Sequence, residues 1–283
     1  MTTISADKAW DDDRAVRWLA RAAGLERQLA PVDDVLFAAA ALRPGERVLD
    51  VGCGTGPATR RAAREVGTAG RAVGLDISAR LLAEAAAQPN EDGAACLEWV
   101  PADAVTWRPD PDAFDVVLSR FGTMFFSDPA TAFGTLAAAT RPRGRLAMAV
   151  WSPRDESQLF AVPLYAALDE LRRRGVTVQA PPQDAPFSLS DPAAVTALLT
   201  EAGWSDVVCT PHRLVLPVGG LDAKAAASMA HELGPARLMT AELDDDHRAA
   251  VTEAIATAFA RHLDADGHVR LNARILLVTA IRP

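Results

Sequence analysis

The sequence predicts an α/β fold, built on a doubly wound, mostly parallel seven-stranded sheet with extra helical lid elements. Short apolar segments, typical of strands buried on both faces, alternate with helical segments through residue 151. Parallel strands need crossover helices, and this alternation supplies them. Two longer segments, 207–218 and 269–281, have strand character and can form an antiparallel end of the sheet.

Residues 8–44 precede the first strand and show helical spacing of their apolar side chains. Pro31 predicts a break between two helices. Trp10 and Trp18 are the large apolar side chains of this region and are expected to pack against the main domain. We assign residues 1–44 to an N-terminal helical lid.

Local signals define the elements of residues 45–151. Gly67 ends the first helix of this region, and Asp128 is a favourable cap for its last helix. The Arg-Pro-Arg-Gly segment at 141–144 predicts a turn into the fifth strand. Strands are predicted at 47–51, 71–76, 97–101, 114–118 and 145–151, and helices at 57–66, 78–88 and 128–140.

Residues 152–283 add helices and complete the sheet. Pro211 lies within 207–218, which is therefore an edge or irregular strand, because proline cannot donate a ladder hydrogen bond. Helices are predicted at 160–174, 191–201, 221–233 and 244–263.

The first strand runs directly into a glycine-rich turn. Asp50 is the one acidic residue of this strand, Arg-Val-Leu-Asp-Val at 47–51. The following Gly-Cys-Gly-Thr-Gly at 52–56 permits a sharp bend and a close approach of a ligand to main-chain atoms. Pro57 suits the first position of the next helix, where an N–H would have no partner.

Spacing excludes two other nucleotide-binding motifs. A dinucleotide-binding G-x-G-x-x-G needs a small third residue where this chain has Pro57. A phosphate-binding G-x-x-x-x-G-K-[ST] loop needs a lysine that is missing. The remaining pattern, an acid in the strand followed by G-x-G-x-G, closely resembles motif I of the class I S-adenosylmethionine (SAM)-dependent methyltransferases. The segment after the fourth strand, residues 119–126, resembles that of the ubiquinone-biosynthesis type of these enzymes.

The resemblance implies a Rossmann-like methyltransferase fold with SAM as cofactor. It makes residues 45–151 the SAM-binding core and residues 152–283 the C-terminal part of the sheet with helical insertions that cover the substrate. The glycine turn would offer main-chain donors to the cofactor's carboxylate. The resemblance assigns cofactor contacts to Asp50, Gly52, Cys53, Gly54, Asp76, Ile77, Asp103, Ala104 and Arg120.

Two of these assignments, Asp76 and Asp103, can also be explained by ordinary local structure. Asp76, at a strand end, can accept hydrogen bonds from both ribose hydroxyls, and it can also cap the helix that begins near Ser78. Asp103 matches the acid that meets the adenine amino group, although an Asp after a strand is ordinarily a turn residue. Main-chain atoms near Arg120 are expected to face the methionine part of the cofactor, while Phe125 and Phe126 are expected in the core.

The composition of the chain limits the classes of molecule that it is expected to bind. A net charge of −8 argues against nucleic acid, because phosphate binding needs clustered Lys and Arg. Three scattered cysteines without a C-x-x-C pair fit a reducing compartment. With no apolar segment long enough for a membrane and an acidic start unlike a signal peptide, we expect a cytoplasmic protein that acts on a small molecule. The oligomeric state stays open, a homo-oligomer included.

The predicted activity is methyl transfer to a small, fairly apolar metabolite. Helices at 8–44, 158–174 and 221–263 should lie over the carboxyl ends of the strands and form the substrate pocket. Its apolar side chains would be Trp10, Trp18, Phe160, Tyr165, Met229 and Met239. Such a pocket must align donor and acceptor, exclude water and sometimes remove a proton.

The catalytic base is not assigned. His231 is the first candidate to test, although a lone helical histidine is more often structural. None of the five histidines forms an H-E-x-x-H or H-x-x-x-H pair, so no metal is predicted. Two alternative functions keep the fold: a cyclisation or rearrangement with SAM in a structural role, and a non-catalytic ligand-binding module.

Overall fold

The computed structural model describes residues 12–91, 93–182 and 186–283. It contains one seven-stranded sheet with strand order β3-β2-β1-β4-β5-β7-β6. The strands are β1 (Arg47–Val51), β2 (Arg71–Asp76), β3 (Cys96–Pro101), β4 (Phe114–Arg120), β5 (Thr140–Trp151), β6 (Ser205–Pro217) and β7 (Arg270–Ile281). Neighbours among β1–β5 are parallel, and β7 is antiparallel to β5 and β6. The predicted fold class is confirmed.

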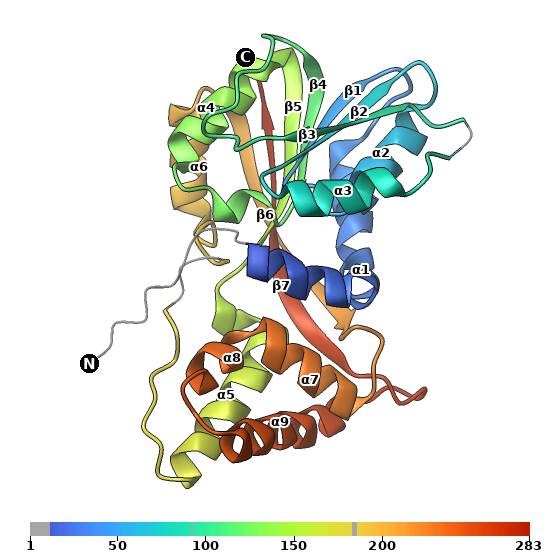
Figure 1. Cartoon of the computed structure of the whole chain (residues 1–283). Coiled ribbons are helices and arrows are strands. Elements are labelled where there is room, and N and C mark those ends of the chain that lie inside the picture. The colour runs from blue at the N-terminus through green and yellow to red at the C-terminus, as the bar shows by residue number, and fades with distance from the viewer. Residues whose placement is uncertain (1–11, 92, 183–185) are drawn as a thin grey trace.

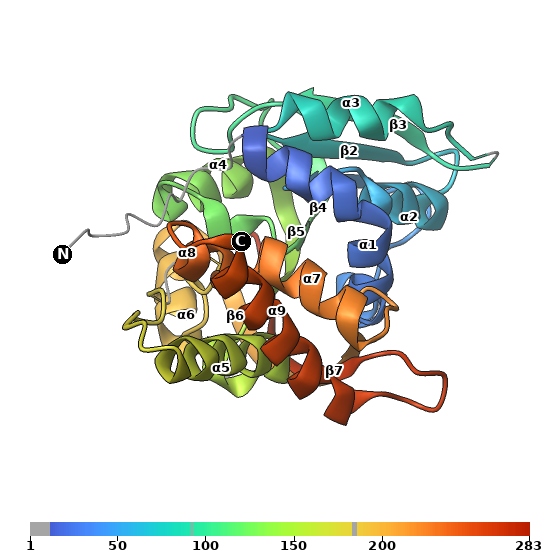
Figure 2. The same cartoon turned by 60° about the horizontal axis from the view of Figure 1, so that its bottom comes forward.

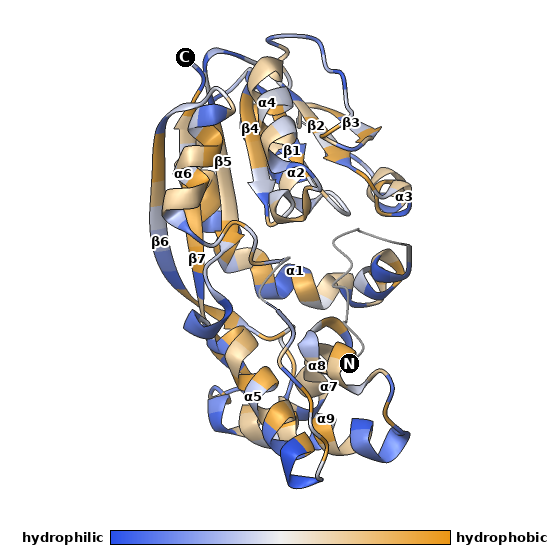
Figure 3. Cartoon of the chain, turned by 90° about the vertical axis from the view of Figure 1, so that its left-hand side faces the viewer, coloured by the Kyte–Doolittle hydropathy of each residue, from blue (hydrophilic) through white to orange (hydrophobic). Residues whose placement is uncertain are grey.

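Helices cover both faces of this sheet, with α4 and α6 on one side and α2 on the other (Figure 1). The helices are α1 (Asp12–Ala40), α2 (Pro57–Val66), α3 (Ala79–Ala87), α4 (Pro129–Ala139), α5 (Gln158–Arg173), α6 (Pro192–Glu201), α7 (Ala223–Leu233), α8 (Pro235–Thr240) and α9 (Asp245–Phe259). Short 3-10 turns lie at Thr123–Phe125, Arg154–Glu156 and Ala260–His262. The core sits on the central strands, whose largely hydrophobic character is visible in Figure 3.

Strands β6 and β7 extend beyond the carboxyl end of β5, and four helices lie at that end of the sheet. The last residue of β5, Trp151, pairs with Ile275 of β7. Residues 270–274 of β7 therefore continue beyond the carboxyl end of β5 and pair with β6 as a ribbon. The helices α5, α7, α8 and α9 gather at this end, below the sheet in Figure 1. We call them the helical layer.

The predicted break at Pro31 is wrong, because α1 continues through it. Apolar side chains on both sides of the proline, Leu29, Val32 and Leu36, are buried and hold both halves of the helix against the core. This packing outweighs the helix cost of proline, about 3 kcal/mol. A proline kink is expected instead, and α1 changes direction along its length in Figures 1 and 2. Trp10 lies outside the described residues.

The turn predicted at 141–144 lies inside β5. The β4–β5 register passes from Phe114 opposite Thr140 to Val116 opposite Arg145. Residues 141–144 therefore bulge out of the ladder, and Arg143 takes a positive φ of 62°. The sequence located the bend but assigned it to a loop. It also missed α8, a short helix that begins at Pro235 just after α7.

Candidate cofactor-binding site

Two glycines bring the ends of β1 and β4 together. Gly52 has a φ of 68°, and a Cβ on it would lie 2.6 Å from the Cα of Gly122. A Cβ on Gly122 would in turn lie 2.5 Å from the Val51 carbonyl oxygen. Side chains at either position would collide with main chain, so the segments after β1 and β4 can meet only as glycines.

Asp76 joins the end of β2 to the same turn. One carboxylate oxygen, Oδ2, accepts a 2.8 Å hydrogen bond from the Gly54 N–H, and Oδ1 accepts one of 2.8 Å from the Ser78 N–H. Burial raises the pKa of Asp76. A carboxylate has about four acceptor positions, so two hydrogen bonds leave capacity for a ligand. Ile77 follows with an exposed side chain.

Asp50 is a buried acid one strand away. Its side chain accepts a 2.7 Å hydrogen bond from the Thr59 hydroxyl and is 1% exposed. Burial raises the pKa of Asp50 to about 7, against the opposing effects of the Thr59 hydrogen bond and the Arg120 charge. At neutral pH this acid is poised between its neutral and charged forms. A cation placed beside it would favour the charged form.

Four main-chain N–H groups of the glycine turn, those of Gly52, Cys53, Gly54 and Gly56, donate to acceptors inside the protein. Gly52 and Cys53 both donate to the Leu75 carbonyl, at 2.8 and 3.1 Å, and Gly56 donates to Cys53. Gly54 donates to Asp76. That the turn offers main-chain donors to the cofactor's carboxylate stays a prediction. The turn fixes the positions of its own neighbours. The Cys53 thiol is buried, which raises its pKa well above the usual range and keeps it neutral.

Arg120 makes a side-chain network that the sequence did not predict. It donates to both oxygens of Glu26 at 2.8 Å and to Asp33 Oδ2 at 2.9 Å, and its side chain is 9% exposed. Both acids belong to α1, two helical turns apart on one face. This network ties α1 to the carboxyl end of β4.

The network carries more negative than positive charge. Within the described ranges, the second oxygen of Asp33, Oδ1, is buried and has no hydrogen-bond partner. Burial raises the pKa of Asp33, and the neighbouring Glu26 adds to this effect. The spacing of Glu26 and Asp33 along one face of α1 was the available signal in the sequence. Their partner Arg120 lies 87 residues from Asp33 in the chain.

Asp103 lies beside this corner, in a turn. Its Oδ1 accepts a 2.9 Å hydrogen bond from the Val105 N–H, as the turn interpretation predicted. The preceding Ala102 donates to the Asp76 carbonyl at 3.1 Å, which holds the Asp103 segment next to β2. Ala104 is buried. The structure thus brings Asp50, residues 52–54, Asp76 and Arg120 to one corner, with the 103–104 segment adjoining it.

Aromatic side chains continue from the corner toward the helical layer. Phe121, with a φ of 64°, stacks on Trp151 at a centroid distance of 3.9 Å. Trp151 meets Phe160 edge to face at 4.9 Å, and Phe160 meets Phe187 at 5.1 Å. Phe125 and Phe126 pack against the core, as expected.

Several side chains expected in the substrate pocket have other surroundings. Tyr165 is 49% exposed and donates to Asp155 at 3.0 Å, while Met229 and Met239 are buried. His231 is buried between two hydroxyls, with Nδ1 2.6 Å from Thr252 and Nε2 2.8 Å from Thr240. Because both ring nitrogens are engaged, His231 is not placed as a free base.

Two features are absent from residues 12–91, 93–182 and 186–283. Among these residues there is no group of three or more His, Cys, Asp or Glu side chains that could hold a metal ion. None of the helices described is both long and apolar enough to cross a membrane.

Residues 48–144 match the family described as "Methyltransferase domain". A relative from Mycobacterium tuberculosis, described as uncharacterized, is 33% identical over 127 residues, which are 45% of this chain. The match spans only about 45% of that relative's length. The nocamycin O-methyltransferase of Saccharothrix syringae is 28% identical over 250 residues, 85% of this chain and 87% of the relative.

Solved structures share the fold at low sequence identity. A phosphoethanolamine N-methyltransferase 2 of Haemonchus contortus, solved with phosphomonomethylethanolamine and S-adenosylhomocysteine, matches with a TM-score of 0.55 at 15% identity. The match covers 96% of this chain and 57% of the other chain.

Proposed function

We propose that this chain, whose residues 48–144 match the methyltransferase domain family, is a class I methyltransferase that binds SAM at the Asp50–Asp76 corner and methylates a small, fairly apolar metabolite. The observation that carries the proposal is the meeting of two buried acids with a glycine turn at the ends of adjacent strands. Open α/β sheets bind their ligands at this edge.

The side chains of the corner fit this cofactor. When bound, SAM supplies a methyl group activated by its positively charged sulfonium. Asp50, buried and with a pKa of about 7, would become charged beside a cation and so favour its binding. Asp76 has acceptor capacity left for ribose hydroxyls, with its carboxylate held in place by Gly54 and Ser78. The exposed Ile77 and the 103–104 segment would border the adenine.

The substrate would lie between this corner and the helical layer. The aromatic series from Phe121 through Trp151 to Phe160 and Phe187 gives that space an apolar wall, which supports an apolar body for the substrate. The similarity to nocamycin O-methyltransferase along most of both chains supports a small-molecule acceptor. We keep the proposed division into a lid at 1–44, a SAM-binding core at 45–151 and a C-terminal part at 152–283.

The main contribution of the protein to catalysis would be to position the acceptor relative to the cofactor. The ion pairs of Arg120 with Glu26 and Asp33 fix α1 against β4, so the cofactor side of the site is held rigidly. A bound acceptor aligned with the sulfonium and shielded from water gains most of its rate from this alignment.

Transfer of a radioactive methyl group tests the proposal. Purified protein is incubated with methyl-labelled SAM and a panel of small hydroxylated and aminated aromatic compounds, and label is counted in the extracted product. Label in the product is the expected result. Product without label would favour the cyclisation alternative, and cofactor binding without any product across an exhaustive panel would favour a non-catalytic module.

A further inference from the structure

Asp33 of α1 keeps one carboxylate oxygen without a hydrogen bond at the edge of the cofactor corner. Its Oδ2 accepts from Arg120 at 2.9 Å, whereas Oδ1 is buried and meets no donor in the part of the chain that the structure describes. A buried acceptor that lacks a donor lowers the stability of the fold. Such a group in a native protein calls for a specific reason, and an absent ligand is one.

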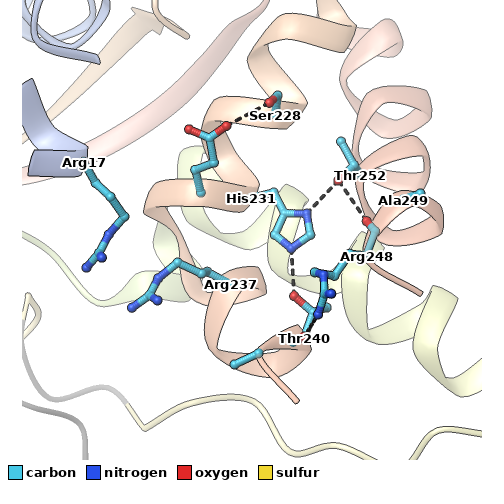
Figure 4. Close-up of a pocket in the computed structure, with 10 residues that line it drawn as sticks. Arg17, Ser228, His231, Arg237, Thr240, Arg248, Ala249 and Thr252 are labelled. Carbon is cyan, nitrogen blue, oxygen red and sulfur yellow. Dashed lines mark hydrogen bonds between the residues drawn. The ribbon is translucent and has the colours of Figure 1, made fainter. Parts of the chain in front are cut away.

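The helical layer holds another side of α1. A cavity of about 610 Å³ lies there, among α1, α7, α8 and α9 (Figure 4), and its lining includes Arg17 of α1 and Arg248 of α9. Glu232, the one acidic side chain of this lining within the described ranges, pairs with Arg21 of α1 at 2.6 Å. His231 of α7 is held between hydroxyls of α8 and α9, as Figure 4 shows.

The position of α1 is therefore set from two sides, by the ion pair of Arg21 with the layer and by the ion pairs of Arg120 with the sheet. Asp33 cannot move to another protein donor without breaking these contacts. A donor for its Oδ1 has to come from a bound molecule.

The charges around Asp33 favour a cationic donor. Arg120 is a buried cation, and three acids act on it electrostatically, namely Glu26, Asp33 and Asp50. Arg61 is the other positive charge that acts on Asp33, and it is paired with one acid of α1 and one of α2. A positively charged N–H group would fill the empty acceptor position and reduce the excess of negative charge.

Asp33 also lies close to Asp50. Burial raises the pKa of Asp50, and the nearby charge of Asp33 adds to this effect. The two acids belong to α1 and β1, so they approach the corner from different elements. A ligand between them would meet acids on two sides.

The strand order places Asp33 at one end of the proposed cofactor. The ribose is assigned to Asp76 at the end of β2, and the adenine to the neighbouring 103–104 segment after β3. The amino-acid part of SAM then extends the other way, across β1 to the end of β4. Arg120 is the last residue of β4 and holds Asp33 there.

We infer that Asp33 is a cofactor-binding residue supplied by α1, whose Oδ1 accepts a hydrogen bond from the ammonium group of SAM while Oδ2 stays bonded to Arg120. This inference rests on the proposed function. It gives α1 a part in selecting the ligand, because a nucleoside without the amino group gains nothing from Asp33.

Three ligands that differ in the amino-acid part test the inference. The full chain is titrated calorimetrically with S-adenosylhomocysteine, with S-adenosyl-3-thiopropylamine, which keeps the amine but lacks the carboxylate, and with 5′-methylthioadenosine, which lacks both. In Asp33→Asn the amide oxygen can still accept from Arg120, and the amide N–H₂ then faces the ammonium group. We expect the two amines to bind Asp33→Asn about tenfold more weakly or worse, and methylthioadenosine to change by less than about twofold.

Asp34→Asn is the matched control. It makes the same substitution at the next residue of α1, whose exposed side chain pairs with Arg61. All three affinities should stay within about twofold of the parent, and both variants should keep its circular dichroism spectrum. Equal effects of the two variants would overturn the inference.

Two further outcomes would also overturn it. An equal loss of methylthioadenosine affinity in Asp33→Asn would show that Asp33 only supports the fold of the site. An unchanged affinity of Asp33→Asn for either amine would show that Oδ1 does not meet the ammonium group.

The same titrations separate this inference from the proposed function. Tight binding of S-adenosylhomocysteine that is equal in the parent and in Asp33→Asn overturns only the role of Asp33. Absence of S-adenosylhomocysteine binding to the parent overturns the methyltransferase proposal, and the role of Asp33 with it.

Discussion

The cofactor corner and the cavity of the helical layer differ in charge and in the way the chain builds them. The corner gathers acids, Asp50 and Asp76, at the ends of neighbouring parallel strands. The cavity gathers arginines from helices that are more than two hundred residues apart in the chain, from Arg17 to Arg248. The two regions therefore differ in the side chains that they bring together, buried acids in the corner and arginines with hydroxyl-bearing side chains in the cavity.

The largest expected effect comes from removing the positive charge of Arg120, which pairs with two acids of α1. Arg120→Met leaves Glu26 and Asp33 in a largely buried place without their partner. We expect a loss of about 4 kcal/mol of unfolding free energy at pH 8, measured by urea denaturation. The loss should shrink as the pH falls and Asp33 takes up a proton, since burial raises the pKa of Asp33.

The cavity provides the matched comparison for that variant. Arg17→Gln removes a positive charge from a half-buried side chain for which the structure gives no acidic partner in the described ranges. Its unfolding free energy should stay within about 0.5 kcal/mol of the parent. Equal losses for the two variants would contradict the contrast between an arginine paired with two buried acids and one without an acidic partner in the described ranges.

The second effect is the pH dependence of folding stability that Asp50 causes. The pKa of Asp50 is raised to about 7 by burial, above its value in the unfolded chain, so the folded state holds this proton more tightly. The contribution of protonated Asp50 to folding stability is complete below pH 4 and is lost as the pH rises to about 7.

Comparison with Asp50→Asn isolates this contribution, because the amide oxygen can still accept from Thr59. The stability of the parent relative to the variant should fall by on the order of 3 kcal/mol between pH 4 and pH 7 and then stay level. Thermal and urea unfolding across this pH range would measure it. A difference independent of pH would show that Asp50 is ionised throughout.

The third effect is on cofactor affinity. Asp76→Asn places an amide N–H₂ where one oxygen accepts from Gly54 or Ser78, and removes an acceptor proposed for the ribose. We expect S-adenosylhomocysteine to bind about 100-fold more weakly, equivalent to about 2.7 kcal/mol. Asp110→Asn, in the exposed loop before β4, is the control and should bind like the parent. Unchanged affinity in Asp76→Asn would remove Asp76 from the site.

The smallest effect distinguishes backbone strain from steric contact in the glycine turn. Gly54 has a φ of 58°, but a Cβ there would meet nothing within 4 Å. Gly54→Ala should therefore cost only the left-handed backbone penalty, about 1 kcal/mol, and lower the Tm by about 3 °C. A rise in Tm would contradict the strained conformation assigned to this position.

The sequence predicted the corner well because its signals are local. Gly52–Gly56 follow the first strand directly, and an acid at the end of the second strand falls beside it in any parallel arrangement. The seven strands and the cap at Asp128 were likewise set by nearby residues. Where the prediction erred, at Pro31, distant packing outweighed a local preference.

The rest depended on contacts between distant elements. The pairing of Arg120 with Glu26 joins residues 94 positions apart, and no spacing rule in the sequence links them. The arginines of the cavity lie on helices whose relative placement the sequence did not define. The residues that line this cavity are not those expected for an apolar pocket, which stays a prediction for the space beside the aromatic side chains.

Calorimetric titration of the purified chain with S-adenosylhomocysteine tests the central claim most directly. The account predicts one site per chain with micromolar affinity, and proton release near pH 7 as Asp50 becomes charged, seen as a dependence of the heat on the buffer's ionisation enthalpy. Absence of binding heat, measured at two temperatures so that a chance zero of enthalpy is avoided, would contradict it.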